Sequence, residues 1–153
     1  MNGRISVTSA LAVIASIILS LNPSAAQLLP PTKPVEHVKI INGPALESAV
    51  PDMAILRWTS TNPGGDDEHY AVAHYGMDPH NLNETAKSHI RLNRYHAETI
   101  FRVRLIGLKP QTTYYYWVTS MGSGGRVDPV KSGINKFTTP PPGKVIIADI
   151  PAK

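Results

Sequence analysis

The 153-residue sequence contains no cysteine, and this absence excludes several kinds of protein at once. Without cysteine the chain has no disulfide framework, no thiol nucleophile and no cysteine-based metal site. Its charge is only weakly biased, with 15 lysines and arginines against 11 acidic residues and no polybasic run. Because nucleic-acid-binding domains concentrate basic residues on one face, we expect no nucleic-acid partner.

Motifs that carry catalysis are also missing. There is no Gly-x-Ser-x-Gly nucleophile motif, and the glycine-rich run 122–125 joins two predicted strands instead of opening a phosphate-binding helix. Several histidines fall within residues 69–96, but His69 and His74 are five residues apart and so would lie on opposite faces of a strand. The sequence therefore predicts no catalytic residues, metal ligands or cofactor, and we expect the chain not to be an enzyme.

Residues 1–26 have the pattern of a secretory signal peptide. A positively charged start is followed by an apolar run from Leu11 to Leu21 and by small residues before a cleavage site after Ala26. An uncleaved membrane anchor is the alternative, although Pro23 and the small-residue site favour cleavage. Residues 27–34 follow as a proline-rich lead-in. We expect a secreted or periplasmic protein without membrane contact after cleavage.

The rest of the chain alternates polar and apolar residues in short segments separated by turn residues. Such segments, spaced about 8 to 12 residues apart, predict an antiparallel β-sandwich. The turn sequence Asn42-Gly43-Pro44 is expected to end the first strand. The predicted strands are residues 35–41, 53–59, 69–76, 86–92, 97–105, 108–118 and 131–139.

The most informative segment is residues 108–118, which read Leu-Lys-Pro-Gln-Thr-Thr-Tyr-Tyr-Tyr-Trp-Val. Its pattern Leu-x-Pro-x-Thr-x-Tyr-x-x-x-Val resembles the start of strand F in fibronectin type III domains. This resemblance implies an immunoglobulin-like sandwich of about seven strands with Trp58 in its core. It also implies that Leu108 and Pro110 shape a corner. Tyr114 would then bury its ring, and its hydroxyl would form a hydrogen bond with the backbone a few residues upstream.

Three segments more narrowly resemble the fibronectin-type domain that precedes the catalytic domain of purple acid phosphatases: Arg57-Trp58-Thr59, Tyr75-Gly76 and residues 105–118. The resemblance implies a domain over residues 35–140 and a C-terminal tail over residues 141–153. It places the ligands of the two-metal site in the catalytic domain, and none of those ligand motifs occurs in this sequence. The tail superficially resembles the first catalytic strand, with Asp149 as its metal-binding aspartate, but one carboxylate cannot hold two metals. We expect the tail to pack on a sheet edge.

A binding surface is the remaining possibility. Because neighbouring residues of a strand point to opposite faces, Tyr115 and Trp117 should stand on the outer face if Tyr114 faces the core. In this family Tyr75 of the adjacent strand would lie near them, and these three aromatics form the candidate binding surface. Alternatively Pro140 to Pro142, the tail or long arginine side chains cover the Tyr115 and Trp117 rings. The strand 69–76 has two possible registers; its inward residues are either Tyr70, Val72 and His74 or, as the resemblance favours, Ala71, Ala73 and Tyr75.

Together these observations predict a secreted, non-catalytic binding or spacer module of fibronectin type III type. Its partner is expected to be another protein or protein domain, with carbohydrate as a further possibility. One alternative is the accessory domain of a metal-dependent purple acid phosphatase without its catalytic domain. The second alternative is a carbohydrate-binding module. Fold-level resemblance does not decide between them, because this fold carries many functions.

Overall fold

The computed structural model describes residues 38–64, 67–93, 95–125, 127 and 130–149. The predicted signal peptide and lead-in lie outside the described residues. Within the described part, no apolar helix reaches the length needed to span a bilayer. The strands are β1 (Ile40–Val50), β2 (Met53–Thr61), β3 (Glu68–Gly76), β4 (Glu84–Arg91), β5 (Glu98–Ile106), β6 (Thr113–Gly122), β7 (Asn135–Thr138) and β8 (Ile146–Ile147).

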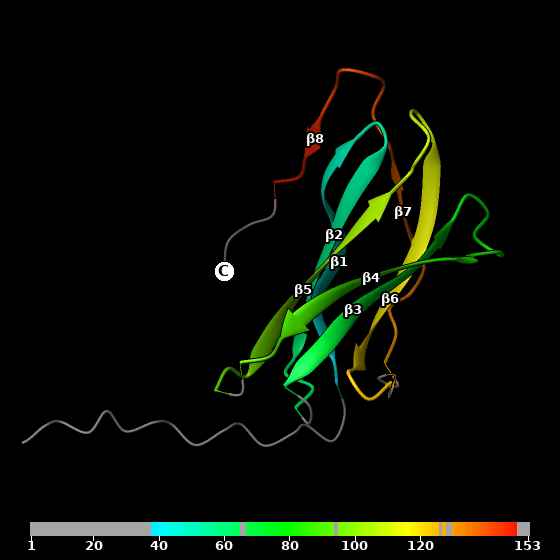
Figure 1. Ribbon diagram of the computed structural model, residues 1–153. Helices are drawn as coiled ribbons and strands as arrows, with labels where there is room; N and C mark the ends of the chain where they lie inside the picture. Colours follow the sequence, from blue (N-terminus) through cyan, green and yellow to red (C-terminus); the bar gives the residue numbers. More distant parts are fainter. Residues whose placement is uncertain (1–37, 65–66, 94, 126, 128–129, 150–153) are drawn as a thin grey trace, which may run out of the picture.

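These strands form two antiparallel sheets that pack face to face (Figure 1). Sheet A has the order β5-β2-β1-β8, and sheet B has the order β4-β3-β6-β7. The prediction of an all-β antiparallel sandwich is therefore confirmed. The alternation of apolar residues explains the arrangement, because each strand presents one face to the opposite sheet and the other to solvent.

The first strand differs from its prediction. Asn42-Gly43-Pro44 does not end it, because β1 runs from Ile40 to Val50 and passes through this turn sequence. Two register shifts in the pairing with β2 absorb the interruption. Gly43 is required there: its φ is +82°, and a Cβ would lie 2.9 Å from the carbonyl oxygen of Arg57. The expectation that Asn42-Gly43-Pro44 ends the strand was wrong because a bulged strand near a sheet edge tolerates both glycine and proline.

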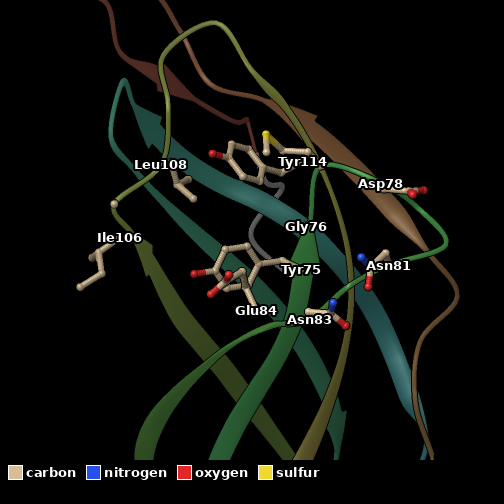
Figure 2. A pocket seen from close by; sticks show the side chains of 11 residues that line it. Tyr75, Gly76, Asp78, Asn81, Asn83, Glu84, Ile106, Leu108 and Tyr114 are labelled. Atoms are coloured by element: carbon tan, nitrogen blue, oxygen red, sulfur yellow. The ribbon is translucent and has the colours of Figure 1, made fainter.

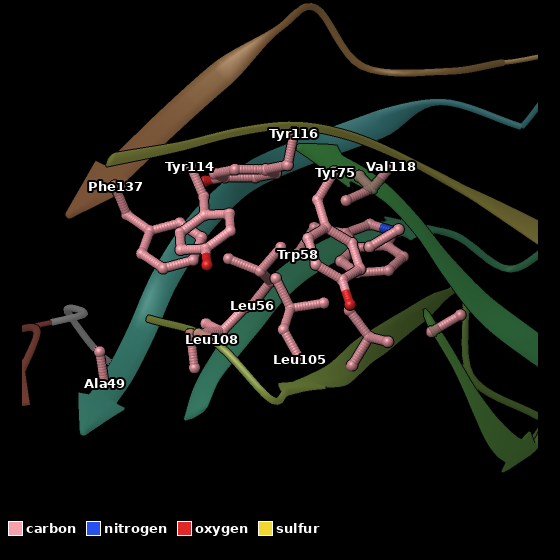
Figure 3. Packing of buried hydrophobic residues seen from close by; sticks show 14 of the residues in the cluster. Ala49, Leu56, Trp58, Tyr75, Leu105, Leu108, Tyr114, Tyr116, Val118 and Phe137 are labelled. Atoms are coloured by element: carbon pink, nitrogen blue, oxygen red, sulfur yellow. The ribbon is translucent and has the colours of Figure 1, made fainter. Parts of the chain in front are cut away.

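The core lies between the sheets and is rich in aromatic rings (Figure 3). Trp58 of β2 is 2% exposed, and its ring stacks on that of Phe101 of β5 with centroids 5.4 Å apart. The inward residues of β5 and β6 are those expected from alternation, and β3 adopts the second register. The buried apolar residues of these strands include Val103, Leu105, Tyr114, Tyr116, Val118, Ala71, Ala73 and Tyr75.

A corner between β5 and β6 fixes the entry of strand β6 into the core. The buried Tyr114 hydroxyl accepts a hydrogen bond from the Lys109 N–H at 2.9 Å, which is the contact implied for a tyrosine corner. The Leu108 N–H donates to the Asp52 carbonyl at 2.9 Å, and the Leu108 side chain is 5% exposed. Pro110 lies exposed in the turn that follows. The backbone of this corner is thus held by both neighbouring segments.

The C-terminal tail packs on an edge of sheet A, as the sequence predicts. Strand β8 pairs antiparallel with β1, with Ile146 opposite Ala49 and Ile147 opposite Ser48. The Ala148 N–H adds a hydrogen bond to the Glu47 carbonyl at 3.0 Å. This short strand covers part of an edge that would otherwise present unpaired backbone groups.

Candidate docking surface

The outer face of sheet B carries a group of rings from two neighbouring strands. Tyr70 and His74 of β3 and Tyr115 and Trp117 of β6 are all half-buried and share this face. We call these four residues the aromatic face. They lie together because β3 and β6 pair along their length and outward residues recur at every second position. The structure therefore brings the predicted Tyr115 and Trp117 onto one surface with two rings of β3.

His74 and Trp117 form the closest aromatic pair of this surface. They are direct cross-strand partners, and their rings stack with centroids 3.9 Å apart and an interplanar angle of 9°. Partial burial, and then the charge of Lys87, lower the pKa of His74 below its ordinary value. The lowered pKa favours the uncharged imidazole, which lies flat against the Trp117 ring.

Lysine side chains surround the rings. The Lys131 ammonium lies over the Trp117 ring, 5.3 Å from its centroid, which is within the range of a cation–π contact. Lys136 is opposite Tyr115 on β7, and Lys87 is opposite Val72 on β4; both are exposed. Lysines thus border the aromatic face near Trp117 and Tyr115, whereas Glu68 borders it next to Tyr70.

Tyr75 does not belong to this surface. The expectation that it stands beside Tyr115 and Trp117 is wrong, because its side chain is 8% exposed and packs in the core against Tyr114. The cause is strand parity: Tyr75 is opposite Tyr116, a core residue, and therefore points inward with it. The outward position next to Trp117 belongs to His74.

The histidines give no metal site in the described part of the chain. No group of three or more histidine, cysteine, aspartate or glutamate side chains there is arranged to hold an ion. His69 is 1% exposed inside the sandwich, whereas His74 stacks on Trp117 and His89 lies 3.3 Å from a carboxylate oxygen of Glu68. The five-residue spacing of His69 and His74 accordingly places them on opposite faces of β3.

Sequence reasoning missed the role of His74, although a signal was present. Once Ala71, Ala73 and Tyr75 are chosen as inward residues, Tyr70 and His74 must face outward on the same strand. The pairing of His74 with Trp117 depends in addition on how far β3 is shifted along β6. That shift follows from the whole pattern of core packing, which no single segment encodes.

The two packed sheets and the Tyr114 hydroxyl contact define a β-sandwich of the fibronectin type III class. A family model described as "Purple acid Phosphatase, N-terminal domain" matches residues 44–139, which is more than half of the 153 residues. The chain therefore belongs to the family of purple acid phosphatase N-terminal domains. This match confirms the narrower resemblance seen in the sequence.

Solved structures of similar shape come from several sources. The sensor domain of the anti-sigma factor RsgI4 of Pseudobacteroides cellulosolvens is 22% identical, with a TM-score of 0.48, over 70% of this chain and 98% of that one. The FN5 domain of Drosophila Lar is 19% identical, with a TM-score of 0.35, over 65% and 98%. The third fibronectin III domain of the human KIAA0343 protein is 15% identical, with a TM-score of 0.35, over 74% and 86%. No curated protein matches the sequence.

Proposed function

We propose that this chain is a secreted or periplasmic, non-catalytic binding module that docks onto another protein domain through the aromatic face. The observation that carries the proposal is the ordered His74–Trp117 stack on an open sheet face, beside Tyr115. Rigid aromatic side chains contribute contact area at a low cost in conformational entropy, and they are frequent among the residues that dominate protein interfaces. The lysines around them would select a partner surface with acidic groups.

The family match favours one class of partner. Purple acid phosphatase N-terminal domains are named for their place beside a metallophosphatase catalytic domain, and this chain belongs to that family. A catalytic domain of that type is therefore our second, more specific candidate for the partner. In that role the module would contribute positioning, and the chemistry would come from the partner.

A carbohydrate ligand is less well supported by the geometry of Trp117. A sugar stacks on a free face of an aromatic ring, but His74 covers one face of Trp117 at 3.9 Å and the Lys131 ammonium also lies over the ring. Tyr115 alone offers a small platform. We expect soluble oligosaccharides to leave the tryptophan fluorescence unchanged, and a saturable change lost in Trp117→Ala would instead favour a carbohydrate-binding module.

The docking proposal can be tested by cross-linking from single positions. Because the chain has no cysteine, Lys136→Cys on the border of the aromatic face and Arg104→Cys on the outer face of sheet A each create a unique thiol for a benzophenone label. After irradiation with the extracellular or periplasmic proteins of the host, we expect one defined cross-linked partner from position 136 and none from position 104. The product should disappear when Trp117→Ala is added.

Equal cross-linking from both positions, or a product that persists without Trp117, would contradict docking through the aromatic face. The absence of any product would favour the spacer function. Mass spectrometry of the cross-linked band then decides whether the partner is a metallophosphatase catalytic domain. Circular dichroism of the Trp117→Ala variant shows whether it retains the fold of the parent.

A further inference from the structure

A cleft opens at one end of the sandwich. It lies between the connection from β3 to β4 and the corner from β5 to β6, and its volume is about 460 Å³ (Figure 2). This size is within the range of about 300 to 1,000 Å³ that is usual for ligand sites. Its lining includes Tyr75, Glu84, Ile106 and Leu108.

The Tyr75 hydroxyl is the most unusual group in this cleft. Tyr75 is 8% exposed and lines the cleft, yet its hydroxyl has no hydrogen bond with any residue that the structure describes. The hydroxyl oxygen is not among the buried unpaired side-chain atoms of the described residues, so it is open to the cleft and can contact a ligand there. Tyr75 therefore offers a solvent-accessible donor and acceptor to a ligand in the cleft.

Glu84 supplies a negative charge beside this hydroxyl. It is the cross-strand partner of Tyr75, and Figure 2 shows its carboxylate reaching toward the same part of the cleft. The two groups interact: burial chiefly, followed by the charge of Glu84 and then Tyr114, raises the pKa of Tyr75 above its ordinary value. The Glu84 carboxylate and the protonated Tyr75 hydroxyl thus lie side by side in the cleft.

The opposite wall is apolar. Ile106 is 69% exposed at the end of β5, and Leu108 follows it after the turn. None of the described residues that line the cleft is basic, although the whole chain carries 15 lysines and arginines. Asp78 also lines the cleft, but its carboxylate accepts the His80 N–H at 2.9 Å and points away from Glu84 in Figure 2. Because the carboxylates of Asp78 and Glu84 point in different directions, they are not arranged to bind one metal ion.

We propose that this cleft receives a lysine or arginine side chain of a partner protein. The ammonium or guanidinium group would donate hydrogen bonds to the Glu84 carboxylate and the Tyr75 hydroxyl, because both basic side chains are rich in donors. The aliphatic stem would lie against Ile106 and Leu108, which gives the same side chain an apolar contact. This site goes beyond the aromatic face and does not depend on it.

The proposal is tested by titrating the isotope-labelled chain with N-acetyl-lysine amide and following backbone amides by NMR. N-acetyl-norleucine amide, which keeps an apolar stem but lacks the charge, is the matched ligand control. We expect saturable shifts at Gly76, Glu84 and Gly107 with the lysine probe alone. Glu84→Gln should weaken binding by about tenfold and Tyr75→Phe by about threefold, because a charged partner contributes more than a neutral one.

Glu98→Gln provides the matched protein control, because it removes the same charge from an exposed residue at the other end of β5. It should bind the lysine probe as the parent does. Each of the following results would overturn the proposal: no saturable shift in the cleft, equal binding of the norleucine probe, or an affinity that is unchanged by Glu84→Gln. Saturation of the same amides by calcium chloride in place of the lysine probe would also overturn it. The spectrum of each free variant shows that it is folded.

Discussion

Trp58→Ala is expected to lower the free energy of unfolding by about 3 to 5 kcal/mol, the range for removing a large aromatic side chain from a core. Trp58 is 2% exposed, and its ring stacks on Phe101 of the neighbouring strand β5. The substitution removes this stack and leaves a cavity that two rigid sheets close only in part. The measurement is urea unfolding followed by far-ultraviolet circular dichroism, which does not depend on the deleted tryptophan.

The second tryptophan provides a control for this experiment. Trp117 is half-buried on the outer face, so Trp117→Ala should cost clearly less than Trp58→Ala despite removing the same side chain. If the Trp58→Ala chain does not fold at all, Trp58→Phe retains much of the volume and should fold with an intermediate loss. A loss below about 1 kcal/mol for Trp58→Ala would be inconsistent with a core position.

Tyr114→Phe is expected to cost about 1 to 3 kcal/mol, the range for leaving a partly buried hydrogen-bonding group without its partner. The change keeps the ring and its packing against Phe137 but removes the oxygen that accepts the Lys109 N–H at 2.9 Å. The effect therefore reports the corner contact alone. Urea unfolding monitored by tryptophan fluorescence gives the value.

The adjacent residue supplies the comparison for Tyr114. Tyr115→Phe also removes one hydroxyl, but that hydroxyl belongs to a half-buried ring on the outer face, so its loss should stay within about 0.5 kcal/mol. Equal losses for the two variants would mean that the Tyr114 hydroxyl does not hold the corner. Retention of parental stability by Tyr114→Phe would lead to the same conclusion.

Much of the sandwich could be predicted because its strands follow a strict two-residue period. Phe101, Val103 and Leu105 alternate with Ile100, Arg102 and Arg104, and this contrast alone identifies the inward face of β5. The corner before Tyr114 was predictable because the resemblance to fibronectin type III domains implies both the turn and the hydrogen bond of the Tyr114 hydroxyl. The path of β1 through Asn42-Gly43-Pro44 was not predictable, because its bulges form only against β2.

The sites were less predictable than the fold, for a physical reason. Tyr115 and Trp117 follow from alternation along one strand, whereas the His74 stack depends on the register between two strands. The cleft depends on still more distant parts of the chain: Tyr75 and Glu84 lie at the ends of β3 and β4, whereas Ile106 and Leu108 lie at the corner that leads from β5 to β6. Sequence patterns report which face a residue occupies, but they do not report which loops meet at the end of a sandwich.

The central claim is that this domain binds and does not catalyse. The most direct test is to measure metal content together with hydrolysis of an aryl phosphate, from acidic to neutral pH, on the purified chain from Gln27 to Lys153. We predict neither stoichiometric metal nor turnover. Bound metal, or phosphatase activity that Asp149→Ala abolishes, would contradict the claim and would identify the tail and the histidines as parts of a catalytic site.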